Sequence, residues 1–444
     1  MYEAQHPHPI CPDSIQSARL EAGLAHIGMF CLPATGHLNP LAALAYELKT
    51  RGHSITFFNL PDLAESVERR GFRFEPLGEV NYPGGALKAD FGRLAALEGP
   101  AAMQFTFAMI ARYEKAVLDE AGPVLNRNAV DFCVIDQLDY GAAALARICQ
   151  IPFVTVSLAL MMNEEDGVPR NAEIPSDDPE QPGRIRAYSA VLAEALQPIL
   201  ELVNQYLRKH NLEPVSTLGE VWSPLAQISQ EPAQFEFPRT QLPPWFHFTG
   251  PFTRPETRPT IAFPEDRLNG KPLVYASFGT VQNRLLPLFE AAAAATAELD
   301  VQLVISFGGQ RPSDVPRLAG NPVVLDIVPQ LKILQRAAVM VTHAGLNSAL
   351  ECLAAGVPMV AIPITNDQPG VSARIVWTGT GVRVLPEECT PDTLRTAIAE
   401  VIGNPSYREA AQRFRHSIAE TNGLARAADI VEQAIHSRAP VLRR

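Results

Sequence analysis

Short apolar runs alternate with segments of helical periodicity over most of the chain. The run 26–32 is almost wholly apolar, and after a loop rich in Pro and Gly, Leu41 and Leu44 begin a pattern of helical spacing. Asn39 and Pro40 suit the N-cap and the first position of that helix, because the N–H that proline lacks would be unpaired there. This stretch predicts a strand, a loop and a helix.

The alternation continues along the chain. In the N-terminal half we expect strands at 54–59, 132–136 and 152–157 and a helix at 142–148. A second series begins at residue 273, with strands expected at 273–277, 301–307, 323–325, 339–342 and 359–364 and a helix at 286–297. Strands and helices in this order predict two α/β domains with mainly parallel sheets.

Proline is dense between Pro169 and Pro264, which indicates a stiff, extended connection between the two series. We expect residues 405–436 to be helical, with the last helix able to pack back on the N-terminal domain, and then a loose tail at 439–444. The expected division is a disordered leader at 1–24, an N-terminal domain at 25–248, a linker at 249–270, a C-terminal domain at 271–420, and a helix and tail at 421–444. Two domains joined in this way leave a cleft where ligands tend to bind.

Composition narrows the classes of protein. A length of 444 residues, with 47% hydrophobic and 19% charged residues, fits two or three globular domains. The net charge of −11 disfavours a protein that binds nucleic acid by neutralising its phosphates. The six cysteines are scattered without a C-x-x-C pair, which argues against a zinc site and for a reducing, cytoplasmic compartment.

The start of the chain lacks the parts of a signal peptide, since residues 1–21 have no basic beginning and no apolar stretch. The longest run without a charged residue, 22–46, is interrupted by Pro and Gly. We therefore expect no membrane span.

The strongest chemical signal begins where the strand at 339–342 ends. His343, Gly345, Asn347 and Ser348 lie on a glycine-containing turn that leads into a helix. The free N–H groups and the positive dipole end of such a helix attract anions, and a glycine lets a diphosphate approach the backbone. The three polar side chains add hydrogen-bond donors.

Further polar residues follow at spacings that suit the rest of a nucleotide sugar. Glu351, one turn along the helix, could accept hydrogen bonds from ribose hydroxyls. Asp367 and Gln368 follow the next strand, where they could hold sugar hydroxyls. A buried histidine and a capped helix are the better explanation of the isolated triplet, but the joint spacing favours a nucleotide-sugar site.

Preceded by Pro329 and Gln330, these residues resemble the donor-binding signature of the family 1 glycosyltransferases, the UDP-glycosyltransferase group. The resemblance covers nearly all of the chain from His26 and includes a second phosphate loop at 275–280. Segments 134–137, 163–164 and 362–370 are most similar to the bacterial zeaxanthin glucosyltransferase-like and macrolide glycosyltransferase-like branch. The resemblance implies the GT-B fold, an α/β architecture with two facing Rossmann-like domains.

Pattern and resemblance together predict donor binding by Ser277, Gly279, Thr280, Ile327, Val328, Gln330, His343, Gly345, Asn347, Ser348, Glu351, Asp367 and Gln368. Two positions depart from the plant-type signature, because Ile327 and Leu346 stand where it has tryptophan. The expected base platform is therefore aliphatic, and backbone groups around Val328 could hold the uracil. TDP-sugars stay open as donors.

His37 is expected in the loop at the carboxyl end of the first strand, on the cleft side. A lone loop histidine is usually polar surface, but the family's catalytic histidine lies in a segment similar to Gly36-His37. A pKa near 6.5 suits a general base. Asp136, at the end of another strand, could bond the far imidazole nitrogen and stabilise the imidazolium. Asp139 is the rival partner, although solvation of a helix start explains it more simply.

Candidate acceptor-binding residues are Phe91, Phe105 and Met109 in the region 82–113, and Met161 after another strand. Soft methionine side chains fit varied hydrophobic shapes, as a lipophilic pocket requires. Ordinary core packing explains these residues nearly as well.

We therefore expect an inverting O-glycosyltransferase that moves a hexose, with glucose favoured, from a UDP-sugar to a hydroxyl of a carotenoid, terpenoid, steroid or polyphenol. No D-x-D pair stands where a cation would bridge the diphosphate, so no metal and no cofactor is expected besides the UDP-sugar co-substrate. A UDP-sugar epimerase or hydrolase and a silent nucleotide-sugar binding module are the alternatives. A nicotinamide dehydrogenase is poorly supported, because no G-x-G-x-x-G follows a predicted strand in this sequence. Peripheral membrane contact, the acceptor and the oligomeric state are left open.

Overall fold

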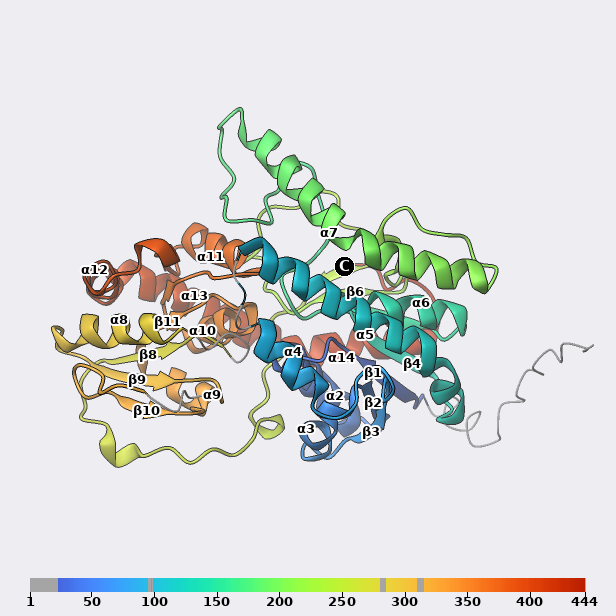
Figure 1. The fold of residues 1–444 in the computed structure, drawn as a ribbon, viewed down its shortest axis with the longest axis horizontal. Coiled ribbons are helices and arrows are strands. Elements are labelled where there is room, and N and C mark those ends of the chain that lie inside the picture. Colours follow the sequence, from blue (N-terminus) through green and yellow to red (C-terminus); the bar gives the residue numbers. More distant parts are fainter. Residues whose placement is uncertain (1–22, 95–96, 98, 280–284, 310–314, 444) are drawn as a thin grey trace, which may run out of the picture.

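The chain folds into two α/β halves that lie side by side (Figure 1). The computed structural model describes residues 23–94, 97, 99–279, 285–309 and 315–443. In Figure 1 the strands β1 to β4 lie on the right and the strands β8 to β11 on the left. The expected leader falls almost wholly outside the described residues, and the expected domain boundaries stay a prediction.

The N-terminal half contains a parallel sheet whose seven described strands have the order β3-β2-β1-β4-β5-β6-β7. Its strands are β1 (His26–Phe30), β2 (Ser54–Asn59), β3 (Arg73–Pro76), β4 (Phe132–Asp136), β5 (Phe153–Ser157), β6 (Gln227–Ser229) and β7 (Phe246–Phe248). β1 is buried at every position, as expected for a strand covered on both faces. Because β1 pairs with β4, the carboxyl ends of these two strands are neighbours.

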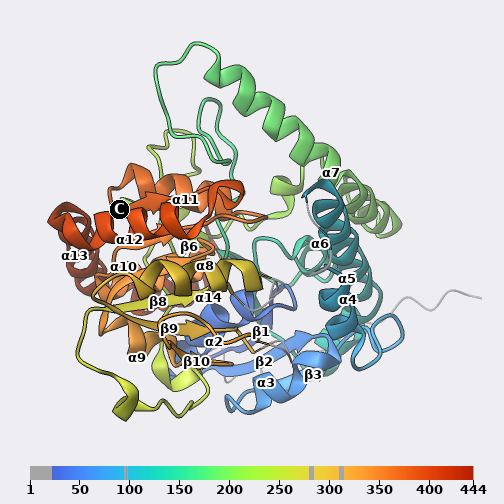
Figure 2. The ribbon, with the colours of Figure 1, turned by 60° about the vertical axis from the view of Figure 1, so that its left-hand side comes forward.

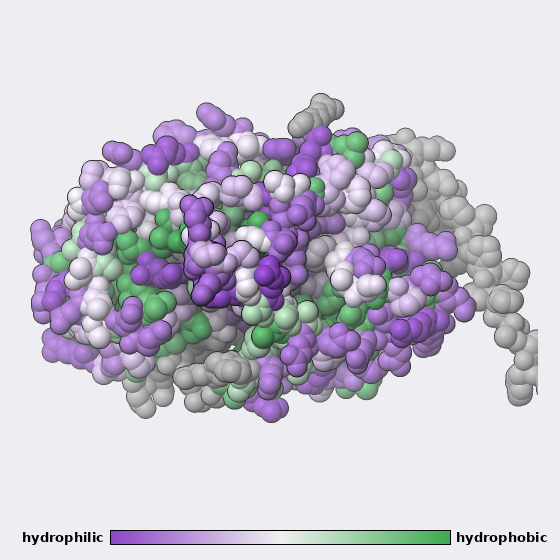
Figure 3. Space-filling model, turned by 90° about the horizontal axis from the view of Figure 1, so that it is seen from above, coloured by the Kyte–Doolittle hydropathy of each residue, from purple (hydrophilic) through white to green (hydrophobic). Residues whose placement is uncertain are grey.

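The helices of this half are α2 (Thr35–Thr50), α3 (Ala64–Glu68), α4 (Ala86–Leu94), α5 (Gly99–Arg127), α6 (Tyr140–Ile148) and α7 (Gln181–Lys209). α5 packs against both α6 and α7. The first part of α7 projects from the body of the molecule in two views (Figures 1 and 2). Figure 3 looks onto this side, which is mostly hydrophilic with hydrophobic residues gathered in smaller areas.

The C-terminal half contains a second parallel sheet with the order β10-β9-β8-β11-β12-β13 among its described strands. The strands are β8 (Leu273–Ser277), β9 (Gln302–Ser306), β10 (Val323–Leu325), β11 (Ala337–Thr342), β12 (Met359–Ala361) and β13 (Gly381–Arg383). The helices are α8 (Leu286–Ala297), α9 (Gln330–Leu334), α10 (Leu346–Ala355), α11 (Gln368–Trp377), α12 (Pro391–Gly403), α13 (Pro405–Thr421) and α14 (Gly423–Ser437).

Helices cover both faces of this second sheet. Alternate residues of a strand point to opposite faces, so one strand contributes to two cores. Val274 and Ala276 of β8 share a core with α8 and α12. Tyr275, between them, shares a different core with α10. The predicted class, α/β with mainly parallel sheets in two halves, is confirmed.

Several expected elements coincide with the structure, among them 54–59 with β2, 273–277 with β8 and 286–297 with α8. The start of the first helix does not. Asn39 is not its N-cap, because α2 begins at Thr35 and Pro40 lies inside it. A helical turn has already formed before the proline, since the N–H of His37 donates to the carbonyl of Ala34.

The C-terminal end also differs in part from expectation. The stretch 405–436 is helical as predicted and is divided into two helices, because Asn422 adopts the left-handed conformation with φ of 43°. α14 then packs into the core of the N-terminal half. The tail is not loose, because the backbone N–H of Val441 donates to the carbonyl of Leu225 at 2.8 Å.

A buried ion pair joins the two halves. Arg374, on α11, donates two hydrogen bonds to Glu236, which lies between β6 and β7, at N···O distances of 2.9 and 2.6 Å. Its third bond goes to the carbonyl of Gly370 at 3.0 Å, and the guanidinium lies 4.3 Å from the ring centre of Phe237. Both charged side chains are 1% exposed or less. The pair therefore fixes α11 against the N-terminal half.

Replacing Arg374 by methionine should lower the free energy of unfolding by about 3–5 kcal/mol, because Glu236 stays buried without its main partner. Arg395→Met is the matched control, since its ion pair with Glu298 is on the surface and should be worth at most about 1 kcal/mol. Urea unfolding of the two variants and the wild type measures the difference. Equal losses in both variants would contradict an anchoring role for Arg374.

Candidate active site

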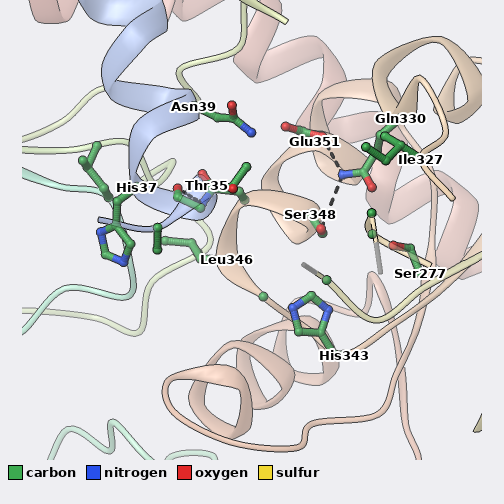
Figure 4. Close-up of a pocket in the computed structure, with 18 of the residues that line it drawn as sticks. Thr35, His37, Asn39, Ser277, Ile327, Gln330, His343, Leu346, Ser348 and Glu351 are labelled. Carbon is green, nitrogen blue, oxygen red and sulfur yellow. Dashed lines mark hydrogen bonds between the residues drawn. The ribbon is translucent and has the colours of Figure 1, made fainter. Parts of the chain in front are cut away.

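A cavity of about 1060 Å³ lies between the two halves. Its walls come from the loop after β1, from α4 and α5, from the linker around Pro255, and from the turns that lead into α10 and α11. Figure 4 shows His37 on one side, and Ser277, Ser348 and His343 on the other. The carboxyl ends of parallel strands deliver these turns to the cleft, as is usual in α/β proteins.

His37 and Asp136 meet at the adjacent ends of β1 and β4. The distance from His37 Nδ1 to Asp136 Oδ2 is 2.6 Å, and the aspartate side chain is fully buried. Backbone N–H groups of Leu32 and Leu138 also donate to this carboxylate, at 3.3 and 3.2 Å. With Nδ1 donating to Asp136, His37 Nε2 is left to face a substrate in the cleft.

The pair makes His37 a stronger base than an ordinary histidine. Burial alone would lower the pKa of His37, but the charge of Asp136 and the hydrogen bond between them raise it above the usual 6.5. A carboxylate that holds the ring and stabilises its protonated form is the arrangement that general-base catalysis needs.

Asp139 does not partner His37. It accepts from the backbone N–H of Ala142 at 3.0 Å and so caps α6. It is nevertheless fully buried, which corrects the expectation of a solvated helix start. Its other oxygen lies 2.7 Å from the hydroxyl of Tyr113, which also lies 3.0 Å from the carbonyl of Cys31. The Tyr113 hydroxyl has only one hydrogen to donate. Both contacts can be full hydrogen bonds only if Tyr113 donates to the Cys31 carbonyl and a protonated Asp139 donates to the Tyr113 oxygen.

Glu114 completes this network and gave no signal in the sequence. Its carboxylate is fully buried, hydrogen-bonds to Asp139, and accepts from the backbone N–H groups of Tyr140 and Gly141. Burial raises the pKa of both carboxyl groups. The two acids therefore share a proton near neutral pH, and the partner of His37 is Asp136.

His343 lies in the turn between β11 and α10, between two glycines. A Cβ atom on Gly279 or on Gly345 would come within 2.7 Å of His343 Nε2, so only glycine leaves room for the ring at either position. Burial lowers the pKa of His343 to about 4, although Asp367 and the Ser277 backbone oppose the shift. The ring is neutral at neutral pH and offers a hydrogen bond rather than a charge.

Glu351 is held at the other end of the donor side. It is 3% exposed, and its two oxygens accept from Arg258 at 2.5 Å and from Gln330 at 2.7 Å. Gln330 Nε2 also lies 3.4 Å from the Ser348 hydroxyl, as the dashed lines in Figure 4 show. Ile327 is 48% exposed at the cavity wall, as an aliphatic platform would be.

The predicted sugar-binding pair reaches the cavity but is partly occupied. Asp367 Oδ2 accepts from the backbone N–H of Leu160 at 3.0 Å, which leaves its second oxygen for a ligand. Gln368 Oε1 accepts from the N–H groups of Ile364 and Thr365 at 2.8 and 2.9 Å. The carboxamide nitrogen of Gln368 is therefore the group it can offer to a sugar hydroxyl.

The remaining donor-side predictions are Val328, Asn347 and Ser348, which also line the cavity. Asn347 donates to the carbonyl of Gly36 in the other half, at 2.7 Å. Thr280 lies outside the described residues.

The four predicted acceptor residues divide into two pairs. Phe91 and Met109 line the cavity. Phe105 and Met161 do not, which corrects their assignment. The ring centre of Phe105 lies 4.9 Å from the guanidinium of Arg93, and Met161 is fully buried in a separate apolar cluster.

Sequence reasoning missed Arg70, which follows α3, and Arg258 of the linker, and both line the cavity. Burial and the neighbouring charge of Arg258 lower the pKa of Arg70. Neither arginine belongs to a recognisable motif, so no sequence signal pointed to them. They add positive charge near Glu351.

The described part of the chain contains neither a metal-binding cluster nor a helix that could span a membrane. No set of three or more His, Cys, Asp or Glu side chains there is arranged to hold a metal ion. None of the helices described is both long and apolar enough to cross a membrane.

Comparisons with known proteins agree with this geometry. The model of the UDP-glucoronosyl and UDP-glucosyl transferase family matches residues 188–432. The zeaxanthin glucosyltransferase of Pseudescherichia vulneris is 30% identical over 93% of this chain and 98% of its own. That of Pantoea ananas is 29% identical over 94% of this chain and 98% of its own.

Solved structures share the fold. The glycotransferase of kitacinnamycin superimposes with a TM-score of 0.72 at 26% identity, over 92% of this chain and 98% of that chain. The calicheamicin glycosyltransferase CalG4 gives a TM-score of 0.70 at 24% identity, over 94% of this chain and 100% of that chain. Fold and cleft thus define a glycosyltransferase of the GT-B type. The chain belongs to the UDP-glucoronosyl and UDP-glucosyl transferase family.

The buried acid pair should give stability a defined pH dependence. The folded protein keeps a proton on Asp139 up to a pKa of about 7, whereas the ordinary group releases it near 3.8. Because the unfolded chain then binds fewer protons, the free energy of unfolding should fall as pH rises between these values, by roughly 1.4 kcal/mol per pH unit. Asp139→Asn removes this titration. In urea unfolding, the wild type should lose stability relative to the variant over this range.

Asp119→Asn is the control for that measurement. Partial burial opposes the shift, but hydrogen bonds from Lys115 and Tyr206 lower the pKa of Asp119 below 3.8, so its titration in both states is essentially complete above about pH 5. The difference between this variant and the wild type should not change with pH there. A flat difference for Asp139→Asn as well would contradict a shared buried proton.

Proposed function

We propose that the protein is an inverting O-glycosyltransferase that moves a hexose, glucose in the first instance, from a UDP-sugar to a hydroxyl of a lipophilic small molecule. The observation that carries the proposal is the hydrogen-bonded pair of His37 and Asp136, which opens into a cavity with an apolar wall on one side and a helix start on the other. Membership of the family supplies the class of reaction. The sugar, the acceptor and the residue roles are our inference.

In the proposed reaction His37 Nε2 takes the proton of the acceptor hydroxyl while the acceptor oxygen attacks the anomeric carbon. The bond from that carbon to the diphosphate oxygen breaks, and UDP leaves with the electron pair from the opposite face. Asp136 stabilises the imidazolium that forms, and His37 later returns its proton to water.

The leaving diphosphate would be held without a metal ion. The N–H groups at the start of α10, the Ser348 hydroxyl and the neutral ring of His343 are aimed into the cleft from fixed positions. Pre-aimed donors stabilise charge that develops in the transition state at little reorganisation cost. The arginines Arg70 and Arg258 supply positive charge nearby.

The acceptor end favours a ligand with an apolar body. Its walls include Leu87, Phe91 and Met109. The hydroxyls of Tyr82 and Thr106 there donate to backbone carbonyls of their own half, at 3.3 and 2.9 Å. With their hydrogens used in this way, these hydroxyls leave a carbonyl or other hydrogen-bond acceptor on the ligand buried without a donor, which costs free energy.

The names of the relatives support the same choice. The zeaxanthin glucosyltransferases of two bacteria match along nearly the whole chain, and their names specify a glucosyl group and a carotenoid alcohol. The five cysteines of the described residues are free thiols, which fits the cytoplasmic location that forms part of the proposal.

The direct test is to incubate the purified chain with UDP- and TDP-sugars and a set of lipophilic alcohols, with mass detection of products. We expect transfer of one or more hexoses from UDP-glucose, with turnover unchanged by EDTA. Sugar released to water in the absence of any alcohol would instead favour a hydrolase. Binding of UDP-sugars without any reaction would favour a silent binding module, and loss of turnover in EDTA that Mg²⁺ restores would contradict the metal-free leaving-group site.

His37→Ala should lower kcat by about 10²–10⁴-fold, the usual contribution of a positioned general base. UDP affinity should be unchanged, because the donor site lies on the other half. Activity of the wild type should fall as pH drops through the raised pKa of His37, since only the free base accepts a proton. Asp136→Asn should move this fall to lower pH, because the charge of Asp136 is what raises that pKa.

The measurement is kcat against pH for both variants, with UDP binding by calorimetry. His37→Asn serves as a second variant that keeps a polar side chain without the base. Full kcat in His37→Ala with unchanged UDP affinity would show that another group takes the proton.

A further inference from the structure

A backbone carbonyl next to the catalytic histidine lacks its regular helical partner. In an α-helix each carbonyl accepts from the N–H four residues later, so the carbonyl of Gly36 would bond the N–H of residue 40. Residue 40 is a proline and has no N–H. The carbonyl of Gly36, one residue before His37, is therefore free to accept a hydrogen bond from elsewhere.

That bond comes from the opposite half. Asn347, the second residue of α10, donates from Nδ2 to the Gly36 carbonyl at 2.7 Å. Figure 4 shows the start of α2, with Thr35 and His37, beside the start of α10, with Leu346 and Ser348. The helix start assigned to the diphosphate is thus tied directly to the first turn of α2, which carries the base.

The amide of Asn347 is held in one orientation. Gln230, 1% exposed at the end of β6, donates from Nε2 to Asn347 Oδ1 and to the carbonyl of Leu158, both at 2.9 Å. A carbonyl accepts only, so Leu158 fixes which end of the Gln230 amide faces Asn347. Gly36 likewise fixes Asn347. Each of these three hydrogen bonds runs from an amide N–H to an oxygen, so neither amide can flip without losing bonds.

We propose that Asn347 and Gln230 are positioning residues that set the distance between His37 and the donor, by clasping the carbonyl that Pro40 leaves free. The proposal rests on the proposed function, because it assigns a role in the same reaction. We name the three residues Gly36, Asn347 and Gln230 the clasp. The base and the leaving group are held by different halves of the molecule. The reaction therefore needs a defined separation between these halves, and small misplacements lower its rate strongly.

The clasp gives Asn347 a role different from its neighbour. Its oxygen and one of its two Nδ2 hydrogens are already used within the protein, so the side chain has only the second Nδ2 hydrogen left for a ligand. Ser348 makes no hydrogen bond to the other half in the described structure, and its hydroxyl meets only Gln330 at 3.4 Å. Ser348 is thus available to the diphosphate, and the two adjacent residues should behave differently when truncated.

Asn347→Ala and Gln230→Ala should each lower kcat by about 10- to 100-fold, with the affinity for UDP within about twofold of the wild type. Ser348→Ala is the contrasting variant, and it should weaken UDP binding. Calorimetry with UDP and steady-state kinetics with the best acceptor measure the two quantities. If Asn347→Ala weakened UDP binding as much as it lowered kcat, Asn347 would be a diphosphate ligand and the proposal would be wrong.

Pro40→Ala tests the clasp without touching its side chains. The new N–H of residue 40 can bond the Gly36 carbonyl within α2, in competition with Asn347. Alanine suits a helix interior better than proline, so the unfolding temperature should stay the same or rise while kcat falls. Adding Asn347→Ala to Pro40→Ala should cost little more, because both changes remove one interaction. Additive losses, or a normal kcat in Pro40→Ala, would overturn the proposal.

A readout that needs no turnover separates this proposal from the proposed function. Amide hydrogen exchange in the segment that contains Gly36 and His37 should be faster in Asn347→Ala and in Gln230→Ala than in the wild type, but not in Ser348→Ala. An inactive wild type with this exchange pattern would defeat the proposed function and leave the clasp standing. Unchanged exchange in both clasp variants would defeat the clasp whether or not the wild type transfers sugar.

Discussion

The structure depends on one geometric constraint, which is that all strands of a parallel sheet end at the same edge. β1 and β4 pair directly, so a histidine after one strand and an aspartate at the end of the other meet although they are 99 positions apart. In the second sheet β11 and β12 are neighbours, and the turns after them carry His343 and Asp367 to one place. Two such edges turned toward each other bring a base and an anion site together with no long-range motif in the sequence.

Burial shifts the pKa values of the groups in and around the cleft, and the result depends on the group and on its partners. Asp136 has two backbone N–H donors and the His37 ring to receive its charge. The nearby acids Glu114 and Asp139 lack such a cationic partner, and burial raises their pKa values instead. His343 is buried too, but in its case the result is a neutral ring. Environments that push the pKa values of neighbouring groups apart give each a separate role.

Much of this could be predicted because the relevant signals are local. The periodicities of β8 and α8 and the turn that contains Gly345 are short-range features, and they appear where the sequence places them. The strand end that carries Asp136 followed from the same periodicity, whereas His37, expected in a loop, lies in the first turn of α2. Their pairing could only be proposed, since a hydrogen bond between distant residues depends on which strands are neighbours.

What escaped prediction depends on tertiary contact. The residues next to Glu114 in the sequence do not mark it as a member of a buried acid pair, because its partner, Asp139, lies at the start of another helix. Arg258 stands in a proline-rich linker and was invisible until the linker was placed against α10. Met161 has the composition of a pocket residue but fills a separate core, because composition does not tell which side of a loop faces the cleft.

The wrongly predicted start of α2 has a different cause. Proline inside a helix breaks a local rule, so the sequence was interpreted in the way that satisfies the rule, with Pro40 as the first residue. The structure instead keeps the proline at an internal position and accepts an unfilled carbonyl at Gly36. Proteins tend to violate local preferences where function requires it, and compensate elsewhere. Here the compensation is the hydrogen bond from Asn347, which crosses the cleft. Pro40, which caused the wrong prediction, is therefore also the residue that leaves the Gly36 carbonyl free to bond the second half of the molecule beside the catalytic base.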